Sequence, residues 1–127
     1  MDAAQALADL TEISSQVEAA VLFDEGGAVT GSTLTEEEAA ELARAAGELL
    51  DRAVSLAEGR DVTQVEASTP AGSVFVVRDG ARRIAATTAP DPTTGLVFYD
   101  LKSCLRESGA ASKPRRRRTT KKPADEA

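Results

Sequence analysis

The stretch that decides the fold is residues 35–59, TEEEAAELARAAGELLDRAVSLAEG. The hydroxyl of Thr35 can accept a hydrogen bond from the N–H of Glu38, and the Glu38 side chain can reach back to the N–H of Thr35. Three consecutive glutamates occupy the first turn, where the helix dipole favours negative charge, and Gly59 can adopt the left-handed conformation that ends a helix. The stretch therefore predicts one long helix with two defined ends.

Two apolar stripes run along this helix. The first has spacings of three and four, which is typical of a face that covers a sheet: Ala39, Leu42, Ala46, Leu49, Ala53 and Leu56. The second begins with small residues: Ala40, Ala43, Gly47, Leu50 and Val54. A glycine in mid-helix costs about 1 kcal/mol relative to alanine, which indicates close approach of another element. Either the helix is buried on two sides in its own domain, or the second stripe is a subunit interface.

The segments on either side of this helix show either the helical spacing of apolar residues or the extended pattern of a strand. Outward from it, the pattern predicts a short amphipathic helix over 2–16, strands at 19–23 and 28–32, three strands at 62–69, 73–77 and 82–89, and a helix over 92–107. Gly26-Gly27 and Asp79-Gly80 supply hairpin turns, and Asp91-Pro92 is typical of an N-cap followed by proline at the first helical position. Cys104 lies on the apolar face of the last helix, as a small core residue would.

Charge divides the 127 residues into an acidic domain, 1–110, and a basic tail, 111–127. The first part carries 8 Lys and Arg against 19 Asp and Glu, and the tail carries 7 basic against 2 acidic residues. An acidic body repels phosphates, so contact with nucleic acid or anionic lipid would fall to the tail, which we expect to be disordered. Its candidate contact residues are Lys113, Arg115, Arg116, Arg117, Arg118, Lys121 and Lys122. The tail is otherwise a solvated charge run, or a phosphorylation site at Thr119 or Thr120.

The sequence favours a protein without catalytic chemistry. It has no histidine, which is the commonest general base and metal ligand, and its single cysteine cannot form a zinc site or an intrachain disulfide. We therefore expect no enzyme activity, no catalytic or metal-binding residue, no cofactor and no small-molecule substrate. The absence of a signal-peptide pattern and of an apolar run of about 18 residues predicts a soluble, cytoplasmic protein.

The ordered series of segments resembles the Roadblock/LC7 domain family, in its small, single-domain bacterial form. The resemblance covers 1–107 and rests on residues 17–29, the Glu/Ala-rich helix, residues 64–67 and 72–80, and Asp91-Pro92 with Gly95-Leu96. One departure is local, since Gln16 stands where many members have a glycine before the first strand. The fold class implied is α+β, in the order α-β-β-α-β-β-β-α, with a five-stranded antiparallel sheet and profilin-like layering. The long helix would cover one face and the terminal helices the other.

The resemblance also implies a homodimer in which long helices pair and sheets join edge to edge. The expected interface combines the small-residue stripe with the strand that follows the long helix: Ala40, Ala43, Gly47, Leu50, Val54, Val65 and Ala67. Members of the family bind or regulate small Ras-like GTPases, or serve as scaffold subunits. Two functions therefore stay open. One is a non-enzymatic, dimeric GTPase regulator or scaffold, and the other is an adaptor that binds nucleic acid or an anionic membrane through its tail.

Overall fold

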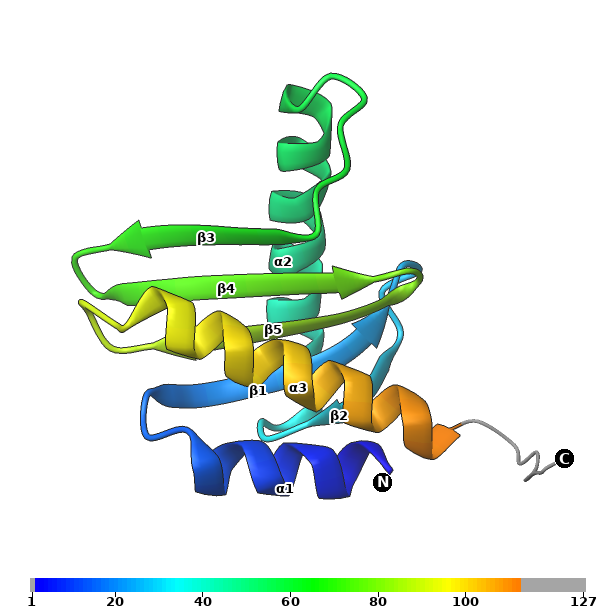
Figure 1. The fold of residues 1–127 in the computed structure, drawn as a ribbon, viewed down its shortest axis with the longest axis vertical. Helices are drawn as coiled ribbons and strands as arrows, with labels where there is room; N and C mark the ends of the chain where they lie inside the picture. Colours follow the sequence, from blue (N-terminus) through cyan, green and yellow to red (C-terminus); the bar gives the residue numbers. More distant parts are fainter. Residues whose placement is uncertain (1, 113–127) are drawn as a thin grey trace, which may run out of the picture.

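The computed structural model describes residues 2–112, including the side chains of residues 2–109. Its eight elements follow the predicted order, and Figure 1 shows them as a five-stranded sheet between two helical layers. They are α1 (Ala3–Ile13), β1 (Val17–Asp24), β2 (Val29–Ser32), α2 (Glu36–Leu56), β3 (Gln64–Thr69), β4 (Gly72–Asp79), β5 (Arg82–Thr88) and α3 (Thr94–Ser112). The predicted fold class is confirmed.

All neighbouring strands of the sheet are antiparallel, in the order β2-β1-β5-β4-β3. The first hairpin joins the three-stranded meander through β1 and β5, so the centre of the sheet is made of strands far apart in sequence. β4 lies between β5 and β3, which explains why its sequence is apolar on both faces. The two edges of the sheet are β2 and β3.

Each face of the sheet has its own core. Under α1 and α3, Phe75 of β4 packs against Phe98 of α3, with ring centroids 5.0 Å apart and planes inclined by 78°. On the opposite face, α2 packs on Val21, Val76 and Ala85 from three adjacent strands. The long helix thus covers one face and the terminal helices cover the other, as Figure 1 shows.

The start of α2 has the predicted capping box. The N–H of Glu38 donates to the Thr35 hydroxyl over 3.2 Å, and the N–H of Thr35 donates to the Glu38 carboxylate over 3.4 Å. At the other end, Gly59 has the expected positive φ of 88°, preceded by Glu58 with a φ of 53°. Local sequence therefore sets both ends of this helix.

Replacing Thr35 with Ala is expected to lower the free energy of unfolding by about 1 kcal/mol, because the N–H of Glu38 loses its acceptor. Urea denaturation measures this loss. Thr35→Ser keeps the hydroxyl and is the matched control, which should stay close to wild type. An equal loss in both variants would show that the methyl group, not the cap, is responsible.

The last helix differs from the prediction at both ends. It begins at Thr94, because the first turn closes on the carbonyl of Thr93, which accepts from the N–H groups of Leu96 and Val97, both over 3.1 Å. Asp91 has a φ of 59°, so the Asp91-Pro92 pair forms the preceding turn and not the helix start. The side chain of Gln16 accepts from the N–H of Thr93 over 2.6 Å.

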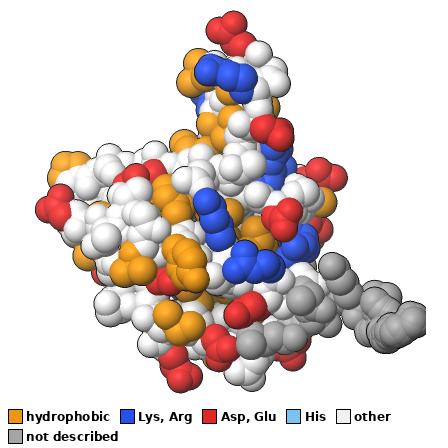
Figure 2. All heavy atoms as spheres, in the orientation of Figure 1, with side chains coloured by type: hydrophobic (Ala, Val, Ile, Leu, Met, Phe, Trp, Pro, Cys, Tyr) orange, Lys and Arg blue, Asp and Glu red, His pale blue; other side chains and the backbone are white. Residues whose placement is uncertain are grey.

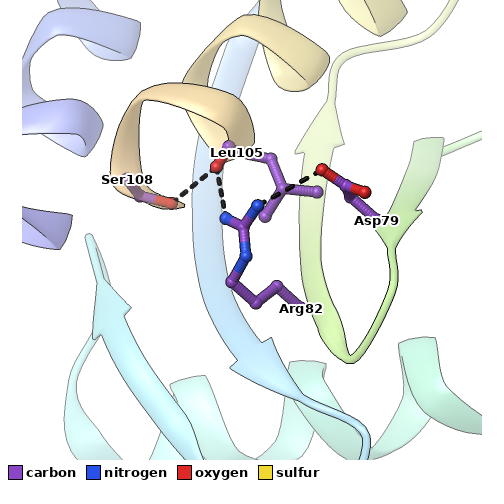
Figure 3. Close-up of polar contacts among 4 residues, drawn as sticks. All are labelled: Asp79, Arg82, Leu105 and Ser108. Atoms are coloured by element: carbon purple, nitrogen blue, oxygen red, sulfur yellow. Dashed lines mark hydrogen bonds and ion pairs between the residues drawn. The ribbon is translucent and has the colours of Figure 1, made fainter. Parts of the chain in front are cut away.

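The helix also continues beyond the predicted residue 107, to Ser112, which places two residues of the expected tail inside α3. Glycine at position 109 leaves room for the Arg82 side chain beside the helix, because a Cβ there would overlap the guanidinium of Arg82. Figure 3 shows that Arg82 reaches from β5 to α3, where it donates to the carbonyl of Leu105 over 2.6 Å and pairs with Asp79 over 3.2 Å. Ser108 donates to the same carbonyl over 2.8 Å. Arg82 thereby fixes the second half of α3 on the sheet.

Candidate interaction surfaces

The predicted interface stripe on α2 is wrong at two positions. Ala43 and Leu50 are 1% and 0% exposed, and both pack on the sheet. The buried face of the helix falls between the two predicted stripes, because its most buried residues combine members of both: Ala39, Ala43, Ala46 and Leu50. Ala43 and Leu50 are therefore core residues that leave no surface for another subunit.

The flanks of α2 stay accessible. On one flank Ala40 is exposed and Gly47 is half-buried, and a Cβ placed on Gly47 would meet no atom within 4 Å. Nothing within the described protomer therefore needs a glycine at this position. On the other flank Leu42 and Leu49 are half-buried at the margin of the core.

The C-terminal end of α2 extends past the sheet, as Figure 1 shows for the part of the helix beyond β3. No residue of α2 after Leu50 is buried. Two large apolar side chains on this part are exposed, Val54 at 38% and Leu56 at 78%. Sequence periodicity placed Leu56 on the sheet-covering face, which is wrong because the sheet ends before the helix does.

The edge strand β3 lies next to this end of α2. Val65 and Ala67 are half-buried, and Val65 packs against the core beneath α2. β3 pairs with β4 along its whole length and with no other strand of the described chain. Its outer backbone groups and the exposed end of α2 form what we call the α2–β3 surface.

A second apolar area lies on the opposite side of the molecule, where periodicity alone did not indicate it. Ile13, Leu96 and Tyr99 are 71%, 50% and 68% exposed, and Figure 2 shows hydrophobic side chains gathered over α1 and α3. A groove of about 240 Å³ between the two helices is lined by Ile13 and Tyr99 and also by Asp9 and Glu107. This groove combines an apolar wall with carboxylates.

The described residues show no arrangement suited to catalysis by the single thiol. Cys104 is buried in the core, where its Sγ donates to the carbonyl of Ala6 over 3.4 Å. Burial, reinforced by the charges of Glu107 and Asp9, raises the pKa of the Cys104 thiol to about 12. At neutral pH the thiol is therefore protonated and a poor nucleophile. Among residues 2–112 no three His, Cys, Asp or Glu side chains lie close enough together to hold a metal ion.

No helix within the described part of the chain is both long and apolar enough to cross a membrane. The predicted tail contacts and the phosphorylation candidates Thr119 and Thr120 lie outside the described residues.

Comparison with solved structures identifies the fold. A Roadblock/LC7 domain from Streptomyces avermitilis superposes with a TM-score of 0.77 at 19% identity, over 87% of this chain and 98% of that one. Gliding protein MglB from Thermus thermophilus gives a TM-score of 0.71 at 14% identity, over 85% and 86% of the two chains. An MglB with a tetrameric arrangement gives 0.60 at 17% identity, over 84% and 86%.

No protein-family model and no curated protein matches this sequence. The structural likeness nevertheless spans nearly the whole of each domain, and it reproduces the series of elements on which the resemblance rests. The chain thus has the fold of the Roadblock/LC7 domain, as the order of its sequence segments indicated.

Proposed function

We propose that this protein is a non-enzymatic, cytoplasmic homodimer that regulates or scaffolds a small Ras-like GTPase. The observation that carries the proposal is the α2–β3 surface, on a fold shared with MglB. A helix that extends beyond its own sheet, next to an open strand edge, is suited to pairing with a second copy.

The open edge and the exposed helix end support a two-fold arrangement. Two β3 strands can pair antiparallel across the axis, which continues the sheet and satisfies their outer backbone groups. Each α2 then extends over the partner's sheet, and the axis brings the two helices side by side. Burying a Val or Leu side chain contributes about 1.5–3 kcal/mol, so covering Val54 and Leu56 in both copies would favour association. The proposal that copies associate is also supported by the similar fold of an MglB that has a tetrameric arrangement.

Gly47→Ala tests whether another helix approaches this flank. In an isolated protomer the substitution should stabilise α2 by about 1 kcal/mol, because alanine has the higher helix propensity and the space is open. We expect it instead to weaken dimerisation, measured by sedimentation equilibrium. Stabilisation without a change in association would remove Gly47 from the interface.

A regulator of this kind acts through binding and not through chemistry of its own. The sequence contains no histidine, and the only thiol is buried with its pKa raised to about 12. Its effect on a GTPase would come from different affinities for the GDP-bound and GTP-bound states, since a ligand shifts a conformational equilibrium only by that difference.

The test is a pull-down in which the full chain is the bait and each Ras-like GTPase of the same organism is loaded with GDP or a non-hydrolysable GTP analogue. We expect one GTPase to be retained, more strongly in one nucleotide state, at both low and high salt. Equal retention of both states would leave a scaffold and exclude a regulator. Retention that disappears at high salt would favour the tail adaptor, because contacts made by a basic tail weaken steeply with ionic strength.

A further inference from the structure

Basic side chains gather at one end of the sheet, although residues 1–110 carry 8 basic against 19 acidic residues. Figure 2 shows a group of them near the centre of the face that α3 covers. Five of the eight come from the end of β4, the start of β5 and the middle of α3: Arg78, Arg82, Arg83, Lys102 and Arg106. A body with this net charge therefore has one locally positive region.

Only part of this positive charge is balanced within the described residues. Arg82 is occupied by Asp79 and by the carbonyl of Leu105. Arg78 pairs with Asp61 at 3.5 Å, and the Asp61 side chain is 92% exposed. An ion pair so open to water contributes little, so Arg78 remains available to another anion.

Lys102 and Arg106 form no ion pair with any residue in the described range. They are one helical turn apart on α3, and both are exposed. The contact made by the Arg106 side chain is a weak one, to the hydroxyl of Ser103 at 3.5 Å. Two neighbouring cations on one helix face repel each other unless an anion lies between them or beside them.

Arg83 adds to the charge at this end of the sheet from the face that α2 covers, because it alternates with Ile84 and shares its face with Ala85. It lies directly opposite Arg78 in the β4–β5 pairing, is 9% exposed, and its Nε has no hydrogen-bond partner among the described residues. Like charges that face each other across two strands are unfavourable, and burial strengthens the effect because less water screens them. An anion in contact with Arg78 would relieve part of this repulsion.

Three of these cations, of which only Arg78 forms an ion pair within residues 2–112, line a pocket. A cavity of about 210 Å³ between α3 and the end of β4 is bordered by Arg78, Lys102 and Arg106, and also by Thr63 and Asp79. Its apolar lining comes from Val77 and Leu105, which are 3% and 2% exposed. The cavity thus combines an apolar wall with a rim of three cations and one carboxylate that Arg82 already binds.

We propose that this basic pocket binds a carboxylate side chain presented by a protein partner. The methylene groups of a Glu or Asp side chain can contact Val77 and Leu105, while its carboxylate receives hydrogen bonds from the cations at the rim. The size of the cavity suits one side chain, and the net negative charge of residues 1–110 opposes a polyanion such as nucleic acid. The inference goes beyond the proposed function, because it requires no GTPase and no dimer.

Amide chemical shifts of the ¹⁵N-labelled full chain test this proposal. The probe is N-acetyl-glutamate α-amide, and the matched control ligand is N-acetyl-glutamine α-amide, which has the same shape without the charge. We expect saturable shifts at Thr63, Arg78, Lys102 and Arg106 with the first ligand, at an apparent affinity at least tenfold higher than with the second. Equal shifts with both ligands, or shifts confined to the tail, would overturn the proposal.

The variant Lys102→Gln/Arg106→Gln should reduce the affinity for the glutamate probe at least tenfold. Arg44→Gln/Arg52→Gln removes the same charge from exposed positions of α2 and should leave the affinity unchanged. Circular dichroism confirms that each variant is folded.

Inorganic phosphate at equal ionic strength forms a third arm of the experiment. Stronger shifts of the pocket amides with phosphate than with the glutamate probe would contradict a carboxylate carried by a protein. Equal losses of affinity for the glutamate probe in the two double variants would also contradict the proposal.

Discussion

Replacing Leu50 with Ala is expected to lower the free energy of unfolding of the protomer by about 2–5 kcal/mol, the usual range for a buried leucine whose cavity cannot fully collapse. Leu50 is 0% exposed and packs in the core between α2 and the sheet. A loss of this size is a large fraction of the stability of a typical domain. Chemical denaturation at several protein concentrations measures the effect and separates it from any change in association.

Val54→Ala is the matched comparison on the same helix. Val54 is 38% exposed and lies beyond the buried part of α2, so its truncation should cost the protomer well under about 1 kcal/mol. If Leu50→Ala instead left protomer stability intact and reduced only the dimer fraction, the assignment of Leu50 to the core would be wrong. The two substitutions therefore separate core from interface along one helix.

The double variant Val54→Arg/Leu56→Arg is expected to be monomeric at concentrations where the wild type is dimeric. The guanidinium group at position 54 lies on the flank of Gly47, where the partner helix is proposed, and desolvating it there costs several kcal/mol when no partner charge is present. Protomer stability should change little, because both side chains are already exposed. Light scattering gives the mass of each species in solution.

Glu41→Arg is the control for charge, since Glu41 is exposed on the side of α2 that faces away from the sheet. It should remain dimeric. If Glu41→Arg dissociated the protein as completely as the double variant, general charge effects would explain both results. A double variant that stayed dimeric would mean that two copies associate through another surface, such as the α1–α3 groove.

Elements whose boundaries depend on local sequence were predicted well. The capping box of Thr35 and Glu38, the hairpin glycines Gly27 and Gly80 and the left-handed Gly59 all have the expected conformations. Each is decided by contacts within a few residues, or by backbone conformations that glycine adopts without strain. For this reason the order of elements, and with it the fold, follows from the sequence.

Features that depend on tertiary contacts were not predicted well from the sequence. The angular position of α2 on the sheet differs by part of a turn from the predicted face, because alanines occur in both stripes and carry little directional information: Ala39, Ala43 and Ala46 are all buried. The continuation of α3 through Gly109 depends on Arg82, which comes from a strand far away in sequence. No periodicity signal reports such a contact.

The candidate surfaces were predictable only in part. Val54 is 38% exposed and so accessible to another subunit, whereas the exposure of Leu56 depends on where the sheet ends. The basic pocket combines Arg78 from β4 with Lys102 and Arg106 from α3, which lie far from it in sequence and were not singled out as a set. The pocket exists only because α3 packs on the sheet, and no sequence pattern indicates which residues that packing brings together.

The most direct test of the α2–β3 arrangement is a distance measurement between two copies by electron spin resonance. In a Cys104→Ala background, Ser55→Cys places one spin label per protomer on the exposed end of α2, and Gln5→Cys places it on the distant helix α1. Paired α2 helices lie about 8–10 Å apart, so with the label arms we expect a distance of about 20–30 Å from position 55. From position 5 we expect more than about 40 Å, because strands spaced about 4.8 Å apart separate the two labels. A short distance from position 5, or no dipolar coupling from position 55 in a protein that is dimeric, would contradict the account.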